Sequence, residues 1–498
     1  PSRLRAARLA HYAPSMRIQF CGADRTVTGS SHLLEVNGLR IFLDMGMFQG
    51  PRDEARRMNE YLPADVTSAD AIILSHGHFD HCGKLPVAVR AGFKGPIYCT
   101  PPTVEVAGLI LEDAARIQIE DAEFLNRRAR TQNEPQVSAL FGPEDVRPVM
   151  RLMKRVPYRQ PTELGKGVRF TFYDAGHILG SAYVILEWAE GGADRKLLFT
   201  ADVGRYGAPI LRDPHPLPGP VDVVITESTY GTSTHGPVGD IEPQLLDAVK
   251  HAIEVKGRLI FPAFAVGRTQ SMLWYLEKFA CEKKIPRVPI FVDSPMGAEA
   301  TRITQAFHDQ FDDETMRMIG DCGRLFAGDR VTLTASKQDS MRINAATGPV
   351  VIIASSPTCE FGRVLHHIKR SVEEPRDTIV FVGWTPYNTL GRRLQAGQKR
   401  VRIYDRWYDL KCQVRTIHGL SAHADGDELL RFLKPTTRKE TEAYVVHGEP
   451  AQAEGFAQRL LDAGMGGATV PALESSVVRW AGGPVQKRTG EPGKADAE

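Results

Sequence analysis

Short apolar runs separated by turn residues dominate the first part of the chain. Residues 17–21, His32–Val36 and 39–44 are such runs, and they predict three consecutive strands. An Asn-Gly pair at 37–38 separates the last two runs and is typical of a two-residue hairpin turn. The apolar run at 71–75 predicts a buried strand that leads directly into a cluster of histidines.

The pattern then changes from strand to helix and back. Residues 104–130 are rich in Glu, Ala, Leu and Arg and contain no proline, so they predict the longest helix of the chain. Three further strands are expected at 168–173, 182–188 and 196–200.

From residue 221 onward, apolar runs alternate with helical stretches. These runs lie at 221–226, 258–261, 288–292, Val350–Ala354 and 378–382. Such alternation predicts βαβ units and a parallel sheet. The last part, 401–480, is expected to return to short strands with one helix at 427–433. Residues 1–15 and 483–498 are predicted to be disordered because they lack a patterned apolar run.

Composition places the chain among ordinary globular proteins. It has 498 residues, of which 42% are hydrophobic and 24% are charged, and its net charge is +2. This length predicts two or three domains. The nearly neutral balance neither favours nor excludes a nucleic-acid partner. No apolar run is long enough for a membrane span, so no membrane association is expected.

The cysteines argue for a reducing compartment. Seven cysteines are scattered along the chain without any CxxC pair, so neither a disulfide framework nor a thiolate metal site is expected. This usage fits a cytoplasmic protein.

The strongest chemical signal is the segment His76-Gly-His78-Phe-Asp80-His81. Four side chains that can bind a metal lie within six residues, directly after an apolar strand. Imidazole and carboxylate together suit zinc or a similar divalent ion. Two further candidates, His177 and Asp202, each close an apolar run just ahead of a turn glycine. A turn role would explain either residue alone, but together with the histidine segment they predict a metal site.

These motifs resemble those of the metallo-β-lactamase superfamily, in which an early Asp, here Asp44, precedes the HxHxDH segment, a His and an Asp. The resemblance implies an α/β fold, a four-layer αβ/βα sandwich with two metal ions. It assigns His76, His78 and His177 to one zinc, and Asp80 and His81 to the other. By the same resemblance, Asp202 bridges both ions and Asp44 orients the histidine loop. The preference for zinc over manganese, the alternative metal, rests on ligand type alone.

The remaining motifs resemble those of the β-CASP ribonucleases. They include 226–231 (TESTYG), 261–270 (FPAFAVGRTQ), 292–297 (VDSPMG), 388–393 (NTLGRR), 421–425 (SAHAD) and 446–449 (VHGE). The resemblance implies a first lactamase part at 16–206, an inserted α/β cap at 207–393 and a second lactamase part at 394–482. It also makes His447 a ligand of the second zinc. Independent chemistry agrees, since Asp80, His81 and Asp202 alone leave that ion short of a protein ligand.

The resemblance implies hydrolysis of single-stranded RNA by a hydroxide held between the metals, leaving a 5′-phosphate and a 3′-hydroxyl. His423, held by Glu227, is the candidate general acid, and Asp80 helps to position the water. The expected enzyme is an endonuclease that can also act as a 5′–3′ exonuclease in RNA processing or decay. The resemblance is also compatible with a homodimer.

Five residues of the inserted segment are candidate RNA contacts: Arg268, Ser356, Arg363, Arg392 and Arg393. For each arginine, a solvated surface role is the alternative. The sequence departs from the family beside Ser356, where Pro357-Thr358 replaces the usual Gly-Met. Because proline has no N–H to donate, a weaker or differently shaped phosphate contact is expected.

Two other functions compete with ribonuclease activity. The metal ligands alone are compatible with hydrolysis of another ester, such as a thioester or a small phosphodiester. An inactive RNA-binding scaffold is the third interpretation, and retention of all seven metal-type residues argues against it.

Overall fold

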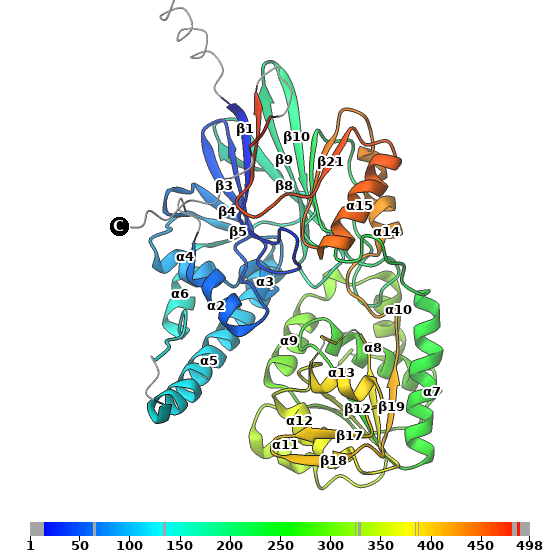
Figure 1. The fold of residues 1–498 in the computed structure, drawn as a ribbon. Coiled ribbons are helices and arrows are strands. Elements are labelled where there is room, and N and C mark those ends of the chain that lie inside the picture. The colour runs from blue at the N-terminus through cyan, green and yellow to red at the C-terminus, as the bar shows by residue number, and fades with distance from the viewer. Residues whose placement is uncertain are drawn as a thin grey trace, which may run out of the picture. The chain divides into compact units, whose positions relative to one another are not determined.

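The computed structural model describes residues 14–62, 66–132, 136–323, 325–326, 330–383, 385–386, 388–480 and 486–488. The chain forms two compact units (Figure 1). The first contains residues up to Gly204, Pro214–Thr234 and the part from His423 onward, and the second contains Arg205–Asp213 and His235–Ala422.

The first unit is built on two sheets. The eight-stranded sheet has the order β23 (Gln486–Arg488), β22 (Ser476–Trp480), β1 (Pro14–Phe20), β2 (His32–Val36), β3 (Leu39–Leu43), β4 (Ala71–Ile73), β5 (Ile97–Cys99) and β6 (Met153–Arg155). The seven-stranded sheet has the order β21 (Gly467–Thr469), β20 (Glu442–Val445), β11 (Val223–Thr226), β10 (Ala193–Phe199), β9 (Ala182–Glu190), β8 (Val168–Asp174) and β7 (Thr162–Gly165).

Alternating side chains of these strands enter different cores. Ile73 and Val184 belong to one buried cluster shared by both sheets. Their neighbours Ile72 and Ile185 belong to two other clusters, each formed by the outer face of one sheet and its helices. The helices covering the eight-stranded sheet are α3 (Phe79–Cys82), α4 (Leu85–Arg90), α5 (Pro101–Gln132) and α6 (Pro143–Leu152). The other sheet carries α14 (Gly426–Leu433) and α15 (Pro450–Asp462) (Figure 1). The predicted four-layer α/β sandwich is therefore confirmed.

The second unit contains a six-stranded, wholly parallel sheet. Its order is β14 (Val331–Leu333), β13 (Ile290–Val292), β15 (Val350–Ala354), β12 (Arg258–Pro262), β16 (Thr378–Phe381) and β19 (Gln413–Thr416). Its principal helices are α7 (Ile241–Glu254), α8 (Arg268–Cys281), α9 (Pro295–Ala306), α10 (Asp313–Cys322), α11 (Lys337–Ile343), α12 (Arg363–Ser371) and α13 (Leu390–Gln395). Leu259 and Ile260 face two different helix-covered cores, so the sheet is buried on both sides. This confirms the parallel sheet expected from the alternating pattern.

The compact units do not end where the sequence motifs suggested. β11 is hydrogen-bonded between β10 and β20, so Pro214–Thr234 returns to the first unit instead of beginning the insertion at 207. At the other end, β19 pairs with β16, so the second unit continues to Ala422 and not 393.

Three other expectations need correction. Pro14 and Ser15 already belong to β1, and β23 pairs with β22, so these residues are ordered strands. The rest of the predicted disorder, residues 1–13, 483–485 and 489–498, lies outside the described residues. The end of the chain has a second helix, α15, whose apolar spacing of Ala453, Phe456 and Leu460 was the missed signal.

A disulfide joins Cys281 to Cys322, so the expectation that the cysteines stay unpaired is wrong for these two. They lie at the ends of α8 and α10, and packing of these two helices in the second unit brings their Cα atoms to 5.8 Å. Separately, among the described helices none has the length and apolarity needed to cross a bilayer.

Candidate metal centre

The histidine segment follows β4 directly and ends in the short helix α3. A strand end that passes into a tight helical turn brings alternate side chains to one point. His76 and His81 are completely buried, while His78 and Asp80 are partly accessible. His177 follows β8, Asp202 follows β10, and His447 follows β20, so the distant candidates also come from strand ends.

One group of ligand atoms gathers around His78. His78 Nδ1 lies 3.1 Å from His76 Nε2 and 3.2 Å from His177 Nε2. Asp202 Oδ2 lies 3.5 Å from both of those Nε2 atoms. The four residues therefore present one converging atom each.

A second group shares Asp202 with the first. His81 Nε2 lies 3.3 Å from His447 Nε2 and 3.4 Å from Asp202 Oδ2. Asp80 Oδ2 is 3.5 Å from His447 Nε2 and 4.0 Å from His81 Nε2. The structure thus brings the seven residues together in two groups. His76, His78, His177 and Asp202 form one and Asp80, His81 and His447 the other, with Asp202 also near His81 and His447.

The spacing and chemistry of these atoms fit zinc. Ligands at 2.0–2.1 Å from a tetrahedral ion are about 3.4 Å from one another, which matches the separations within both groups. Burial lowers the pKa of His76 and brings that of His78 to about 4, so both rings are neutral and can offer a lone pair. Asp202 Oδ1 is buried and accepts no hydrogen bond from the described residues. A shared cation would satisfy that carboxylate.

Asp44 contacts His81 and Ser75 on the side away from the converging ligand atoms. Its backbone is left-handed, with φ of 60°, which turns the carboxylate under the loop after β4. Asp44 accepts hydrogen bonds from Ser75 N–H at 2.8 Å, Ser75 Oγ at 3.0 Å and Ser30 Oγ at 3.1 Å, and its Oδ2 lies 2.7 Å from His81 Nδ1. Burial alone would lower the pKa of His81, but Asp202 and Asp44 raise it. The Nδ1 proton is therefore fixed toward Asp44, and Nε2 faces the ligand group.

Glu227 and His423 lie beside the shared aspartate. Glu227 follows β11, and its Oε2 lies 3.1 Å from His423 Nδ1. The Val203 N–H donates to Glu227 Oε1 at 2.6 Å and fixes the carboxylate. His423 Nε2 is 4.0 Å from Asp202 Oδ2 and remains partly exposed. Burial opposes protonation of His423, but the charge of Glu227 raises its pKa to about 9.

The sequence did not single out the groups that orient these ligands. Besides Ser30 and Ser75, Thr229 Oγ1 lies 3.2 Å from His447 Nδ1 and positions that ring. Short polar residues are common in loops, so their type carries no signal. Ser75 lies next to His76 and Thr229 lies two residues after Glu227, which is a weak clue, but Ser30 is distant from every ligand in the sequence.

The five predicted RNA contacts all belong to the second unit. Arg268 begins α8, and Arg392 and Arg393 lie in α13. Ser356 Oγ is 2.8 Å from Thr358 Oγ1 and accepts the Thr358 N–H. Arg363 donates to the buried Asp293 at 2.8 Å and to Ala335 O at 3.0 Å, so its guanidinium already has protein partners.

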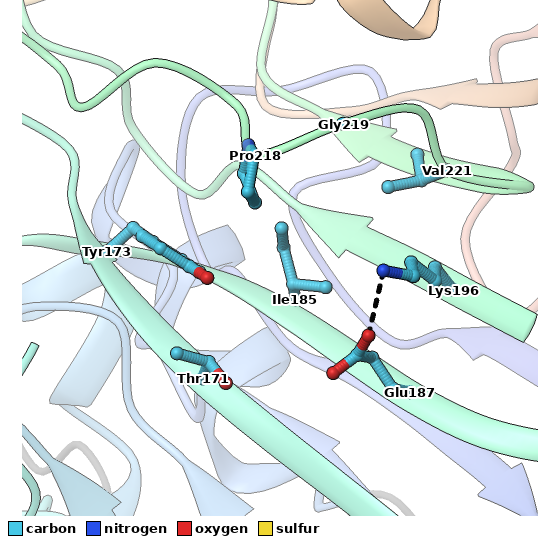
Figure 2. Close-up of a pocket in the computed structure, with 8 residues that line it drawn as sticks. All are labelled: Thr171, Tyr173, Ile185, Glu187, Lys196, Pro218, Gly219 and Val221. Carbon is cyan, nitrogen blue, oxygen red and sulfur yellow. Dashed lines mark ion pairs between the residues drawn. The ribbon is translucent and has the colours of Figure 1, made fainter. Parts of the chain in front are cut away.

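A small pocket on the seven-stranded sheet lies apart from this chemistry. Figure 2 shows it between β8, β9, β10 and the loop before β11, with Lys196 paired to Glu187 at 2.9 Å. Its volume of about 80 Å³ suits a few water molecules rather than a nucleotide, and none of the predicted ligands lines it.

Comparison with known proteins agrees with this architecture. Three family models match the chain: a Metallo-beta-lactamase superfamily domain at 33–199, a Beta-Casp domain at 269–394, and a Zn-dependent metallo-hydrolase RNA specificity domain at 407–471. A structure of a protein of unknown function from Enterococcus faecalis aligns with a TM-score of 0.52 at 12% identity, covering 93% of this chain and 99% of that one. This likeness concerns the fold alone.

Curated relatives are closer in sequence. Ribonuclease TTHA0252 of Thermus thermophilus is 35% identical over 87% of this chain and 93% of its own length. Transcription termination factor FttA of Methanosarcina mazei is 30% identical over 87% and 67%, and an RNase J-like protein of Methanocaldococcus jannaschii is 27% identical over 89% and 95%. Together with the three matching domains, these relatives show that the chain belongs to the β-CASP ribonuclease group of the metallo-β-lactamase superfamily.

Proposed function

We propose that this protein is a zinc-dependent ribonuclease that hydrolyses single-stranded RNA and leaves a 5′-phosphate and a 3′-hydroxyl. The observation that carries the proposal is the convergence of seven His and Asp side chains into two adjacent groups. Asp202 belongs to the first and lies within 3.5 Å of His81 and His447 of the second, and the Glu227–His423 pair lies beside them. The names of the relatives, ribonuclease and RNase J-like protein, support RNA as the substrate.

His76, His78 and His177 would hold one ion, Asp80, His81 and His447 the other, and Asp202 both. Bound divalent cations supply Lewis acidity toward a phosphate ester and lower the pKa of water. Asp44 keeps the His81 ring in the tautomer whose Nε2 lone pair faces inward. His76, His81, His177, Asp202 and His447 are buried, whereas His78, Asp80 and His423 are partly accessible, so a substrate would approach past these three side chains.

His423 is the candidate proton donor to the departing 3′ oxygen. Its Nδ1 is engaged by Glu227, which leaves Nε2 as the atom that can carry a proton toward the substrate. Glu227 would keep the imidazole oriented and stabilise its charged form. Asp80, partly exposed beside His447, would help to position the attacking water. Arg268, Ser356, Arg363, Arg392 and Arg393 stay predictions as RNA contacts, as do the homodimer and the cytoplasmic location.

The test is hydrolysis of a 5′-labelled single-stranded RNA and its fully duplexed form, with His76→Ala as the control. We expect cleavage of the single strand, two zinc ions per chain by elemental analysis, and at least about a 100-fold loss in the variant. End-group analysis should find 5′-phosphates. Absence of cleavage by protein loaded with zinc or manganese would contradict the proposal and favour a different ester, which thioester and small phosphodiester substrates would then identify.

A further inference from the structure

A groove in the second unit lies apart from the candidate metal centre, and none of the seven candidate ligands lines it. It lies between α13, the start of α12 and the hairpin of β17 (Arg400–Ile403) and β18 (Arg406–Asp409), both labelled in Figure 1. Its volume is about 540 Å³, which falls within the range of small-ligand sites. Leu365, Leu390 and Ile403 give it an apolar lining. We call this feature the hairpin groove.

Two large aromatic side chains line the hairpin groove and face solvent. Trp407 is 60% exposed and Tyr404 is 52% exposed. The hairpin register pairs Trp407 with Arg402, and Tyr404 stands in the two-residue turn with a left-handed φ of 53°. In a hairpin with a two-residue turn, the turn fixes the pairing of the two strands and therefore the positions of Tyr404 and Trp407. Two exposed aromatics over one groove are unusual on a surface that has no ligand to cover them.

The groove and its hairpin are basic. Residues 392–411 include seven Lys and Arg against two Asp. Arg393 and Arg402 line the groove itself, together with one carboxylate, Glu360. The Nε of Arg393 is buried and has no hydrogen-bond partner among the described residues, while its two other guanidinium nitrogens contact Glu360 at 3.3 Å and Asn388 O at 3.2 Å. Among the described residues, the one ion pair of Arg402 is a 3.7 Å pairing with Asp405, an almost fully exposed carboxylate.

We propose that the hairpin groove binds one or two nucleotides of single-stranded RNA, with a base stacked on Trp407 or Tyr404 and the flanking phosphate beside Arg402 and Arg393. Every base has a π-face, so an aromatic platform accepts it without regard to sequence, and guanidinium groups match phosphate. The groove would be a second RNA contact that raises affinity without taking part in hydrolysis. The choice of RNA as ligand rests on the proposed function.

The same features argue against a protein partner as the first choice. Trp, Tyr and Arg are also common in protein contacts, so what favours RNA is the excess of cationic side chains around the rings, seven Lys and Arg against two Asp in 392–411. Arg400 lies 5.9 Å from the centre of the Trp407 ring, and Lys369 lies 5.7 Å from that of Tyr404. An alternation of aromatic and cationic side chains is the chemistry of single-stranded nucleic-acid grooves.

The test measures equilibrium binding of a fluorescein-labelled single-stranded RNA decamer by anisotropy. It uses the metal-loaded full chain in a Glu227→Gln background, which retains all seven ligands. We expect Trp407→Ala to weaken binding about 5- to 100-fold, and Trp407→Phe to retain most of the affinity. Arg402→Gln should lower the slope of log affinity against log salt by about one. Phe124→Ala is the matched control, because Phe124 is a comparably exposed aromatic on α5 of the first unit.

Two outcomes would overturn the inference. One is equal affinity for Trp407→Ala, Tyr404→Ala and the Phe124→Ala control. The other is unchanged RNA affinity with a Trp407-dependent change of mass in sedimentation, which would assign the groove to a protein contact. A different result would contradict the proposed function. In that case the parent chain would bind RNA through Trp407 but would cleave none. Conversely, if the protein cleaves RNA and Trp407→Ala leaves its KM unchanged, the hairpin groove is not an RNA contact, and the proposed ribonuclease function stands.

Discussion

His81 Nδ1 lies 2.7 Å from Asp44 Oδ2, and both side chains are buried, His81 in α3 and Asp44 directly after β3. This contact decides which nitrogen of His81 faces the metal centre. We therefore expect Asp44→Asn to weaken metal affinity about 10- to 100-fold, because an amide is a poorer acceptor and can present its NH₂ to the ring instead. Competition with a chelator measures this directly.

Asp24→Asn is the control for that measurement. Asp24 is also a buried carboxylate of the first unit, but its oxygens have no hydrogen-bond partner among the described residues. Burial raises its pKa, and the amide of Asn keeps the size of the side chain while removing its charge. Equal losses of metal affinity in both variants would show that any change of a buried carboxylate disturbs the centre.

Glu227→Gln should separate metal binding from turnover. None of the seven ligands is altered, so the metal content should stay unchanged. The neutral amide that this substitution introduces cannot stabilise a charged His423 as the carboxylate does, and we expect kcat to fall about 100-fold or more. The readout is kcat together with metal per chain. Loss of metal from the variant would instead make Glu227 a support of the ligands.

Most of the metal centre could be predicted from the sequence because its ligands sit at strand ends within short motifs. His76, His78, Asp80 and His81 need only one loop, and the order of the later candidates matched a known pattern. Second-unit side chains were harder to interpret. Arg363 looked like a phosphate contact, yet it donates to Asp293, a carboxylate from the end of another strand. No local pattern reveals a partner that folding brings from 70 residues away.

The limits of the compact units and the cysteine pair depend on contacts between distant parts of the chain. The position of β11 between β10 and β20, and of β19 beside β16, depends on long-range strand pairing rather than on local composition. Cys281 and Cys322 are 41 residues apart and meet only through the packing of α8 and α10. The spacing of cysteines in a chain without a repeated pattern gives no means to foresee such a pair.

The Cys281–Cys322 bond predicts a definite thiol count. Five of the seven cysteines should react with a thiol reagent in denatured, unreduced protein, and all seven after reduction. Cys281→Ser should lower the free energy of unfolding by about 3–4 kcal/mol, since a closed loop of this length restricts the unfolded chain. Seven reactive thiols in denatured protein before any reduction would contradict the bond. Disulfides are rare in reducing compartments, so the protein should be assayed freshly isolated.

Arg363 is expected to act on stability. Its guanidinium contacts Asp293, which is fully buried and also accepts from His367 Nε2 at 2.7 Å and Ser340 Oγ at 2.6 Å. We expect Arg363→Gln to lower the free energy of unfolding by about 2 kcal/mol, because Asp293 loses its cationic partner. Arg302 provides the control, because it forms an exposed ion pair with Glu299. Arg302→Gln should change the free energy of unfolding by less than about 1 kcal/mol. A raised KM for RNA with unchanged stability would restore the phosphate-binding interpretation.

Glu277 on α8 predicts how stability depends on pH. The side chain is buried, its Oε2 accepts the Phe326 N–H at 2.8 Å, and burial raises its pKa from 4.5 to about 7. Between these values the folded chain keeps a proton that the unfolded chain has released, so the group's contribution to stability is lost as pH rises through that window. Glu277→Gln retains an acceptor oxygen and removes the charge. In urea unfolding, the free energy of unfolding of Glu277→Gln should exceed that of the parent by about 1–3 kcal/mol at pH 8 and should equal it at pH 4.5. Glu440→Gln, at an exposed site, should differ by less than about 0.5 kcal/mol at either pH, and an equal pH-independent effect of both variants would contradict the assignment.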